Sequence, residues 1–465
     1  MRLALAALAA AALAALVAAC APTPYAPSFS PVDSDGHDLR DAEGRVKVYR
    51  GVNVHIAGIF DVGFADGRAP REPLPAFDAS DPIDMRARGF DLVRLPINWS
   101  AIEPARGQFD DAYLDRVAGI VAWCRAAGVD VLLDLHEDGW SKELCEDGAP
   151  LWAIEPPPAM LTGGPVPGPD CHASAAAIAA FDSFWDDADG LEEAYVDMLV
   201  HVAARFRDEP AIIGYELMNE PIGADDAIEA FQARAAAALR AADPKKLVVF
   251  EPAATRNFTN ASPISATPFP VAGAVYAVHV YTAIFNNTAT LADGTYPQLL
   301  SDSIHGARDE ADGWRTPLMV TEYGLGSTEP AGPAWIGHAL DDFDAVGAST
   351  TWWLWKDPTP GGWGLFDPQP DDSYTPRAAM MDALSRPYAM AVGGDVVATT
   401  FDGASLSLVL RGRDDVPARH DIFWNRGTPA ITCDGKPVAA DSADGSVYVV
   451  RCGGAGTHTL TFAPR

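Results

Sequence analysis

The sequence predicts an α/β fold, a (β/α)₈ barrel, followed by a small C-terminal all-β sandwich. The barrel is predicted because eight short apolar segments alternate with longer amphipathic segments between residues 46 and 385. Strands that are buried on both faces are continuous apolar runs, whereas surface helices repeat apolar residues every three or four positions. The sandwich is predicted because the helical patterns stop after residue 385, and short strand patterns separated by turns follow.

The eight barrel strands are rich in Val, Ile, Leu and aromatic residues and are bounded by Gly, Pro or charged residues. They cover residues 48–54, 92–97, 129–135, 212–218, 247–250, 275–280, 318–321 and 350–355. Amphipathic patterns between them predict helices at residues 110–127, 191–207, 225–242 and 335–346. The C-terminal strands are predicted at residues 399–410, 421–424, 430–433, 447–452 and 457–462. An open nucleotide-binding sheet is the alternative fold, but residues 53–58 lack the glycine spacing of a phosphate-binding turn.

The start of the chain predicts export. Arg2 is followed by an unbroken run of Ala, Leu and Val residues, and Val17-Ala18-Ala19-Cys20 resembles the lipobox of bacterial lipoproteins. We therefore expect a membrane-anchored lipoprotein that is lipidated at Cys20, with plain signal-peptide cleavage and secretion as the alternative. The predicted units are a signal peptide with the lipobox cysteine (1–20), a proline-rich linker and N-terminal extension (21–45), the barrel (46–385) and the sandwich (386–465).

Composition and charge limit the ligands. Of the 465 residues, 48% are hydrophobic and 21% are charged, which argues against a disordered chain. The formal net charge of −31 argues against nucleic acid as a partner, because phosphates would be repelled. Neutral ligands such as sugars are favoured instead, and we expect a monomer.

Export permits disulfide bonds. Cys433 and Cys452 flank a short strand pair and are predicted to bridge, and Cys145 and Cys171 bracket a segment rich in Pro and Gly and are predicted to close it. Cys124 lies in a helical pattern and is expected to be buried and unpaired. The cysteine spacing does not match a zinc site.

Functional residues of a (β/α)₈ barrel lie where its strands end. The side chains at these positions are Arg94, His136, Asn219, Glu220, His279, Tyr281, Glu322 and Trp355. Glu220 ends the fourth strand and Glu322 ends the seventh, so the two carboxylates face each other across the mouth. Two carboxylates about 5–5.5 Å apart carry out retaining glycoside hydrolysis. Metal or serine chemistry is not expected, because the sequence has no His-Glu-x-x-His and no Gly-x-Ser-x-Gly motif.

These motifs carry a resemblance to a known family. Asn219-Glu220-Pro221 and Thr321-Glu322-Tyr323-Gly324 resemble the catalytic signatures of glycoside hydrolase family 5. Other site positions of that family are matched in the same strand order by Arg94, His136, His279, Tyr281 and Trp355. The resemblance covers residues 46–385, and it implies a retaining glycosidase that needs no cofactor and no metal.

Three further segments resemble endoglycoceramidases, which cut the bond between an oligosaccharide and ceramide. They are His136-Glu137-Asp138, residues 148–152, and Arg386-Pro387-Tyr388 at the start of the β domain. The resemblance implies a glycosphingolipid substrate and membrane association through it. Typical members carry a lysine after the first strand, whereas residues 53–60 of this chain are more like the branch that acts on galactosyl-ceramide linkages, so the glycan preference is open.

Roles can be assigned from residue chemistry. Glu322 is expected to be the ionised nucleophile, held by Tyr281 and by Arg94, whose charge should lower its pKa. Glu220 is expected to be the acid/base and must hold a proton at rest. Asn219 suits the sugar 2-hydroxyl, which strengthens its contact in the transition state. The remaining expected roles are hydroxyl binding by His136 and Asp138, a site role for His279, a sugar-ring platform at Trp355, and a buried ion-pair partner at Glu216.

Two other functions stay open at this stage. An endo-β-glucanase or mannanase acting on polysaccharide would use the same machinery, and a non-catalytic surface lipoprotein could bind glycans through the β domain. The lipid-substrate interpretation predicts an apolar strip on the Glu220 side, where the leaving group departs. The candidates for this strip are Ile59, Phe60, Leu151, Trp152 and Phe285.

Overall fold

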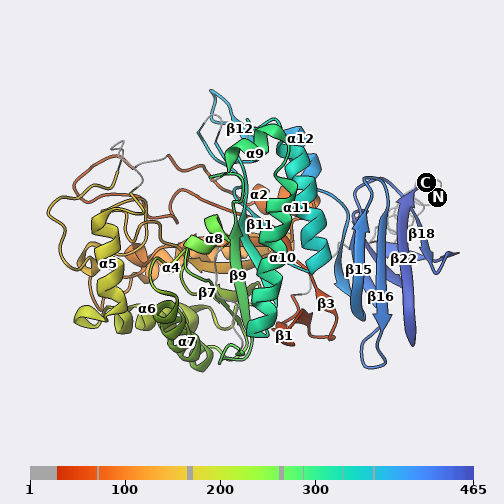
Figure 1. Ribbon diagram of the computed structural model, residues 1–465, viewed down its shortest axis with the longest axis horizontal. Helices are drawn as coiled ribbons and strands as arrows, with labels where there is room; N and C mark the ends of the chain where they lie inside the picture. The colour runs from red at the N-terminus through yellow and green to blue at the C-terminus, as the bar shows by residue number, and fades with distance from the viewer. Residues whose placement is uncertain are drawn as a thin grey trace, which may run out of the picture.

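The computed structural model describes residues 29–70, 73–164, 171–260, 267–285, 287–326, 328–359, 362–442 and 444–465. Eight parallel strands form a closed barrel (Figure 1). They are β4 (Arg50–Asn53), β5 (Leu92–Ile97), β6 (Asp130–Leu135), β7 (Ile212–Glu216), β8 (Leu247–Phe250), β9 (Ala274–Val280), β10 (Leu318–Tyr323) and β11 (Ser349–Trp352). Each strand overlaps its predicted range, and the predicted (β/α)₈ barrel is confirmed.

Helices surround the barrel. They are α2 (Ser80–Ala87), α3 (Trp99–Ile102), α4 (Asp111–Ala127), α5 (Ala175–Trp185), α6 (Leu191–Phe206), α7 (Asp225–Ala242), α8 (Thr255–Thr259), α9 (Thr288–Asp293), α10 (Pro297–Trp314), α11 (Gly332–Val346) and α12 (Ala378–Leu384). Helix α4 shows why the sequence sets these boundaries. The Asp110 carboxylate accepts from the Tyr113 N–H at its start, and Gly128 ends it with a positive φ of 77°. Between these ends, Leu114, Val117 and Val121 are buried, so the helix packs its apolar face inward.

The C-terminal domain consists of two packed antiparallel sheets. One contains, in spatial order, β1 (Val32–Ser34), β2 (Leu39–Asp41), β3 (Val46–Lys47), β14 (Tyr388–Val392), β17 (Arg419–Phe423), β21 (Val447–Arg451) and β20 (Ala440–Ser442). The other contains β15 (Asp395–Phe401), β16 (Leu406–Gly412), β22 (Gly456–Pro464), β18 (Pro429–Cys433) and β19 (Lys436–Pro437). Leu408 and Phe462 of the second sheet pack with Ile422 and Trp424 from the side of the first, forming one core. The predicted sandwich is therefore present.

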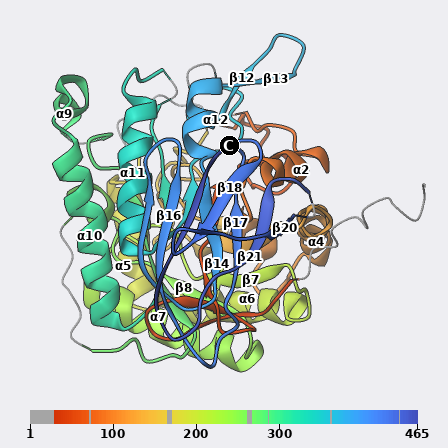
Figure 2. The ribbon, with the colours of Figure 1, turned by 90° about the vertical axis from the view of Figure 1, so that its right-hand side faces the viewer.

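Two predictions about this region were wrong. Residues 399–410 are not one strand, because the chain reverses at Asp402-Gly403 and forms the β15–β16 hairpin. The N-terminal extension is not separate from the folded units either. Its strands β1–β3 extend the first sheet of the sandwich (Figure 2), while Val32 and Leu39 pack against barrel residues such as Leu247. Residues 1–28, with Cys20 and the proline-rich segment, lie outside the described residues.

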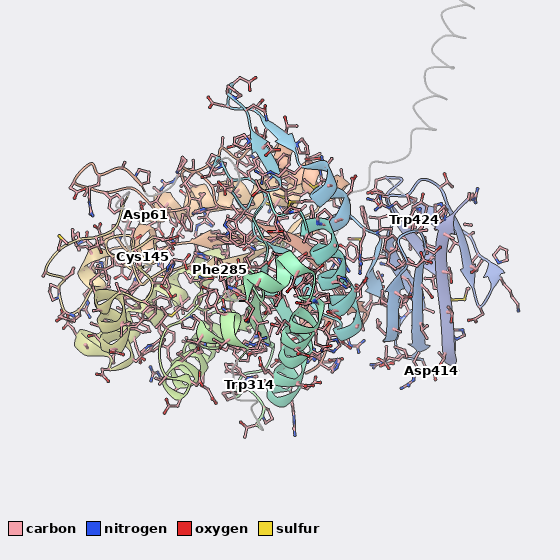
Figure 3. All side chains as sticks on the ribbon, turned by 45° about the horizontal axis from the view of Figure 1, so that its top comes forward. Asp61, Cys145, Phe285, Trp314, Asp414 and Trp424 are labelled. Carbon is pink, nitrogen blue, oxygen red and sulfur yellow. A yellow bond between two sulfur atoms is a disulfide. The ribbon has the colours of Figure 1, made fainter. Side chains whose placement is uncertain are left out.

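The sandwich packs at the N-terminal ends of the barrel strands, opposite the mouth. The Tyr388 hydroxyl donates to the Gly89 carbonyl just before β5, at 2.9 Å. A polar cavity of about 110 Å³ lies between the two units and is lined by side chains that include Lys47, Asp91, Asp130 and Asp421. In Figure 3, Trp424 and Asp414 mark the sandwich, while Asp61, Cys145 and Phe285 lie in the other part of the molecule.

Both predicted disulfides are present. The Cα atoms of Cys433 and Cys452 are 5.6 Å apart, and the bond joins the end of β18 to the residue after β21, so it links the two sheets. The Cα atoms of Cys145 and Cys171 are 5.3 Å apart, and this bond closes the long segment between β6 and α5. Cys124 is free and buried as predicted, and burial raises the pKa of its thiol to about 12.

Candidate active site

The interior of the barrel changes from apolar to polar toward the mouth. Successive side chains of a strand point to opposite faces, so residues two positions apart share the same face. Buried Leu92, Leu132, Val249 and Ala277 belong to an apolar cluster that contains Leu247 and Met319. Two positions further along the same strands stand Arg94, Asp134, Glu251 and His279, which are also buried. The upper end of the barrel is therefore a dry compartment of charged groups.

Arg94 is the centre of this compartment and is fully buried. Its partners are Glu216 Oε2 (2.5 Å), Glu322 Oε1 (2.6 Å), Asn219 Oδ1 (2.8 Å), Asn53 Oδ1 (3.1 Å) and Asp134 Oδ2 (3.1 Å). A buried guanidinium is stable only when its donors are matched in this way. The expected ion pair with Glu216 is present, and Arg94 links two catalytic candidates, Glu322 and Asn219.

Glu322 is held from both sides. Arg94 donates to Oε1 at 2.6 Å, and the Tyr281 hydroxyl donates to Oε2 at 2.6 Å. Burial raises the pKa of Tyr281 well above its usual range, so this hydroxyl keeps its proton and acts as a donor. Arg94 lowers the pKa of Glu322 as expected, and His279 acts in the same direction, but burial outweighs both charges and the net pKa is raised.

Glu220 has a strained backbone, with φ of +39°. A non-glycine residue in this region costs of order 1–3 kcal/mol, and such strain concentrates at functional sites. Its Oε1 accepts from Asn257 Nδ2 at 3.1 Å and lies 2.7 Å from His279 Nδ1. Oxygens of Glu220 and Glu322 and a ring nitrogen of His279 all lie within 4.8 Å of one another. This separation is short of the 6.5–9.5 Å or so that an inverting mechanism needs for its water.

A second set of polar groups lies beside the first. His136 Nδ1 contacts Asp134 Oδ2 at 2.5 Å, and Nε2 lies 3.3 Å from Asp138 Oδ2. Burial lowers the pKa of His136, but the Asp134 and Asp138 carboxylates outweigh it, so the net pKa is well above the usual range. Trp353 stacks on the His136 ring, with centroids 5.6 Å apart and planes at 9°. This wall offers charged hydrogen-bonding groups and an aromatic face to a sugar.

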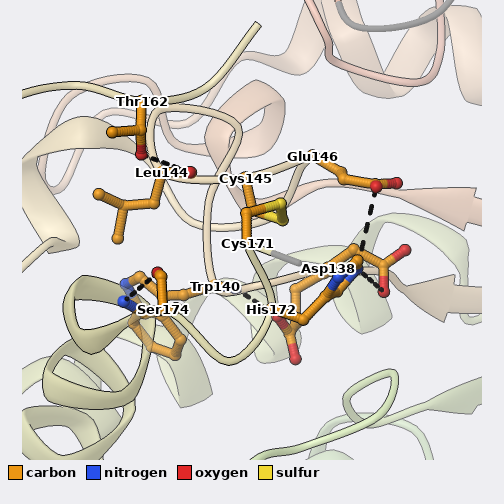
Figure 4. Close-up of a disulfide and its surroundings, with 11 residues drawn as sticks. Asp138, Trp140, Leu144, Cys145, Glu146, Thr162, Cys171, His172 and Ser174 are labelled. Atoms are coloured by element: carbon orange, nitrogen blue, oxygen red, sulfur yellow. Dashed lines mark hydrogen bonds and ion pairs between the residues drawn. A yellow bond between two sulfur atoms is a disulfide. The ribbon is translucent and has the colours of Figure 1, made fainter. Parts of the chain in front are cut away.

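The Cys145–Cys171 disulfide brings His172 to this wall (Figure 4). His172 Nε2 lies 3.7 Å from Asp138 Oδ1 and 3.9 Å from Glu146 Oε1. Because the next residue after Cys171 is His172, the bond fixes where the imidazole stands. The sequence had singled out the two cysteines but not the histidine between the bond and α5.

The expected sugar platform at Trp355 was wrong. Trp355 is 1% exposed, packs on Phe366 and Phe90, and donates its indole N–H to Asp81 Oδ1 at 2.9 Å. The prediction had assumed that strand alternation continues to residue 355, but β11 ends at Trp352. The platform at the mouth is Trp353, which follows that strand and is partly exposed.

Other site residues escaped the sequence analysis. Asn257 lies in the short helix α8, and its contact with Glu220 has no sequence signal beyond its position after the fifth strand. Asn53 and Glu251 stand at or just after the ends of β4 and β8, the type of position that had identified the others. His136, Asp138 and Asp147 lie close enough to share a cation, as do Glu220, His279 and Glu322. In the first set the imidazole of His136 already contacts Asp138, and in the second the imidazole of His279 already contacts Glu220 and Glu322.

A (β/α)₈ barrel with two facing carboxylates at its mouth, one held by Arg and Tyr, has the architecture of a retaining glycosidase. Residues 79–358 match the model of the cellulase family, glycosyl hydrolase family 5, and the chain belongs to this family.

Within this family, the chain is similar to endoglycoceramidases, both in sequence and in structure. The chain is 33% identical over 325 residues to endoglycoceramidase I of Rhodococcus hoagii, a match that covers 63% of each chain. Its match to the endoglycoceramidase of Cyanea nozakii is 30% identical and covers 42% of each. The lactosyl-enzyme intermediate of endo-glycoceramidase II from Rhodococcus sp. superposes with a TM-score of 0.75 at 27% identity, covering 92% of this chain and 99% of that one. An endogalactoceramidase structure gives a TM-score of 0.76 at 25% identity, covering 93% and 100%.

Proposed function

We propose that this protein is a retaining β-glycosidase that hydrolyses the bond between glycan and ceramide in glycosphingolipids. The observation that carries the proposal is the Glu220–Glu322 pair, which faces across the mouth of the barrel with oxygens within 4.8 Å. The similarity to endo-glycoceramidase II over 92% of the chain supports the glycolipid as substrate.

The geometry supports a double displacement. Glu322 attacks the anomeric carbon while Glu220 gives its proton to the departing glycosidic oxygen, so the C–O bond breaks and a glycosyl ester forms. Glu220, now a carboxylate, then takes a proton from water, whose oxygen attacks the same carbon and releases Glu322. Arg94 and Tyr281 hold the two oxygens of Glu322 in line for both steps.

An aromatic cluster that packs on Tyr281 at the mouth supports a lipid substrate. Phe258 follows Asn257, the donor to Glu220, and its ring lies 5.6 Å from that of Phe285. Phe285 is 58% exposed and also packs on Trp363 at 5.5 Å. Burial of each methylene of a ceramide chain against such a surface is worth about 0.8 kcal/mol.

The predicted apolar strip is only partly supported. Ile59 and Phe60 are buried, and Phe60 packs on the rings of His55 and His136, so they belong to the core. Trp152 is partly buried against Trp99. Leu151 is exposed like Phe285, and the aromatic cluster at the mouth consists of Phe258, Phe285 and Trp363, which pack on Tyr281.

The substrate class is tested by comparing a glycosylceramide with the methyl glycoside of the same sugar. We expect kcat/KM to be larger for the glycosylceramide by orders of magnitude, with ceramide and free oligosaccharide as products. Proton NMR of the first sugar released should show retained anomeric configuration. Equal rates on the two substrates, or faster release of reducing sugar from a β-glucan, would establish the polysaccharide-cleaving function instead.

We also propose that the protein is exported as a monomer and anchored by a lipid on Cys20. No helix of the described residues is long and apolar enough to cross a membrane. A Cys20→Ala variant should lose incorporation of labelled fatty acid and leave the membrane fraction. Unchanged acylation would refute the anchor. Sedimentation at several concentrations tests the monomer.

A further inference from the structure

A third carboxylate lies behind the catalytic pair. Glu251 follows β8 directly and is 1% exposed. Its Oε1 lies 3.4 Å from His279 Nε2, and the other ring nitrogen of His279 lies 2.7 Å from Glu220 Oε1. The imidazole therefore stands between Glu251 and Glu220, with one nitrogen toward each.

Two polar atoms face each other between these side chains, and the Arg94 guanidinium lies 3.6 Å from the Glu251 oxygen of this pair. Glu251 Oε1 and His279 Nε2 are both buried, and neither has a hydrogen-bond partner among the described residues, although the two atoms lie 3.4 Å apart as an ion pair. Leaving either group unmatched in a buried site is unfavourable, because each loses its hydrogen bonds to water. A proton on Nε2 directed at Oε1 satisfies both atoms at once.

The side chain of Glu251 is not needed to hold its own segment. Gln232 on α7 accepts from the Glu251 N–H at 2.9 Å and donates to the Glu251 carbonyl at 2.6 Å. These two bonds fix the backbone of residue 251 independently of its carboxylate. The carboxylate instead points into the compartment that contains the catalytic groups, where its Oε2 also accepts from the Glu220 N–H at 3.4 Å.

The charged groups around Glu251 and His279 influence which of the two side chains holds a proton. The groups that face Glu251 and His279 are Arg94 on β5, Glu216 on β7, Glu220 after β7 and Glu322 on β10. Burial raises the pKa of Glu251, whereas the positive charges of His279 and Arg94 lower it. Burial lowers the pKa of His279, but Glu251 and Glu322 outweigh it and leave the pKa well above the usual range.

We propose that Glu251 is a positioning residue for the acid/base: it holds a proton on His279 Nε2, so that His279 Nδ1–H is directed at the Glu220 carboxylate. The proposal rests on the retaining mechanism given above. When Glu220 has protonated the leaving oxygen, its new negative charge faces the Nδ1–H donor. When Glu220 later takes a proton from water, the same donor holds the carboxylate in place. His279 neither gains nor loses a proton over the cycle.

The first test needs no activity. In ¹⁵N-histidine spectra of the wild-type protein, His279 should keep protons on both ring nitrogens above pH 7. In Glu251→Gln, Nε2 should lose its proton at a pH lower by at least about one unit, because the carboxylate partner is gone. An identical titration in the two proteins overturns the proposal. If the variant does not fold, the wild-type spectrum tests the proposal by itself. A His279 imidazole that is already neutral at pH 6 would overturn it.

The second test separates positioning from structure by the leaving group. An alkyl or ceramide aglycone needs a proton from Glu220, whereas 2,4-dinitrophenolate leaves without one. Glu251→Gln should slow glycosylation by the alkyl glycoside at least about tenfold and leave the dinitrophenyl burst within about twofold. Equal losses on both substrates would indicate a structural defect and overturn the proposal.

A matched control is Gln232→Leu. It removes both backbone hydrogen bonds of residue 251 but not its carboxylate, so it should lower stability and leave the ratio of the two rates unchanged. If the wild-type protein cleaves neither glycoside, the proposed function fails, and the histidine titration still tests Glu251.

Discussion

Glu220 and Glu322 have different hydrogen-bond environments, and the difference assigns their roles. Glu322 accepts from Arg94 on one oxygen and from Tyr281 on the other, which suits a carboxylate that attacks carbon and leaves as an anion. The hydrogen bonds to the Glu220 carboxylate, from Asn257 and His279, both end on Oε1. We therefore expect Oε2 to be the oxygen that exchanges a proton with the leaving group.

Removal of either carboxylate should abolish turnover, but the two variants should fail at different chemical tasks. Glu322→Ala lacks the nucleophile, and we expect no glycosyl intermediate with any substrate. Glu220→Ala should lose about 10²–10⁴-fold on a glycosylceramide but still form the intermediate from a dinitrophenyl glycoside. Mass spectrometry of the trapped intermediate distinguishes the two. Either variant that keeps more than about a tenth of the wild-type rate would falsify the assignment.

The two tryptophans after β11 should respond oppositely to truncation. Trp353→Ala removes the ring stacked on His136, so KM should rise about tenfold or more while the free energy of unfolding changes little. Trp355→Ala empties a buried core position and should cost about 3–5 kcal/mol of stability, with KM of the folded protein near wild type. Steady-state kinetics and urea unfolding measure both. The reverse pattern would restore Trp355 as the platform.

At the scale of elements, the segment between β6 and α5 forms part of the site. It departs from the barrel after Leu135 and returns at Ala175, and the Cys145–Cys171 bond ties its two sides together. The bond places His172 near Asp138, which pairs with His136. A covalent link outside the barrel thus fixes the position of His172 beside Asp138.

Removal of this bond should weaken substrate binding. A Cys145→Ser/Cys171→Ser variant loses the closure of a loop with a sequence separation of 26 residues. Such a bond is worth about 3 kcal/mol, so the melting temperature should fall. KM should also rise, because His172 is no longer held beside Asp138. The control is Cys433→Ser/Cys452→Ser, which destabilises the sandwich at the far end; a KM unchanged in the first variant would contradict this role.

At the scale of the whole molecule, the sandwich and the mouth lie at opposite ends of the barrel. The sandwich contacts the N-terminal ends of the strands, where Lys47, Asp91 and Asp130 line the shared cavity. The catalytic residues lie at the C-terminal ends of the same strands. This arrangement favours a stabilising role for the sandwich over direct contact with the bond that is cleaved.

The shared cavity should make stability depend on pH. Burial raises the pKa of Asp130 to about 7, although Lys47 and the hydrogen bond from Tyr49 oppose the rise. The folded protein therefore keeps a proton that the unfolded chain loses near pH 4, and this stabilisation is lost as pH rises from about 4 through 7. Asp130→Asn should melt a few degrees above wild type at pH 8 and show a smaller difference at pH 4.

Asp414→Asn is the control for this pH dependence, because it removes an exposed carboxylate of the sandwich without touching the cavity. Its melting temperature should follow the wild type at both pH values. A pH profile of Asp130→Asn parallel to that of the wild type would exclude Asp130 as the group responsible.

The residues at strand ends were predictable because a parallel barrel brings all C-terminal strand ends to one face. Arg94, Asn219, Glu220, His279, Tyr281 and Glu322 could be placed at one site on that ground alone. Trp355 was misplaced because the rule holds only while the strand continues, and β11 stops at Trp352. Asn257 and His172 were missed because their loops reach the site through contacts distant in sequence.

The sequence by itself determined the barrel, the sandwich, both described disulfides and the candidate pair Glu220 and Glu322. These features follow from local patterns of hydrophobicity and from the order of residues along the chain, which can be read directly from the sequence. Only the tertiary structure decided that β1–β3 join the sandwich, that Trp353 rather than Trp355 faces the site, and that burial sets the sign of the Glu322 pKa shift. Pairing partners, exposure and the balance between burial and neighbouring charge depend on distances through space, which spacing along a chain does not contain.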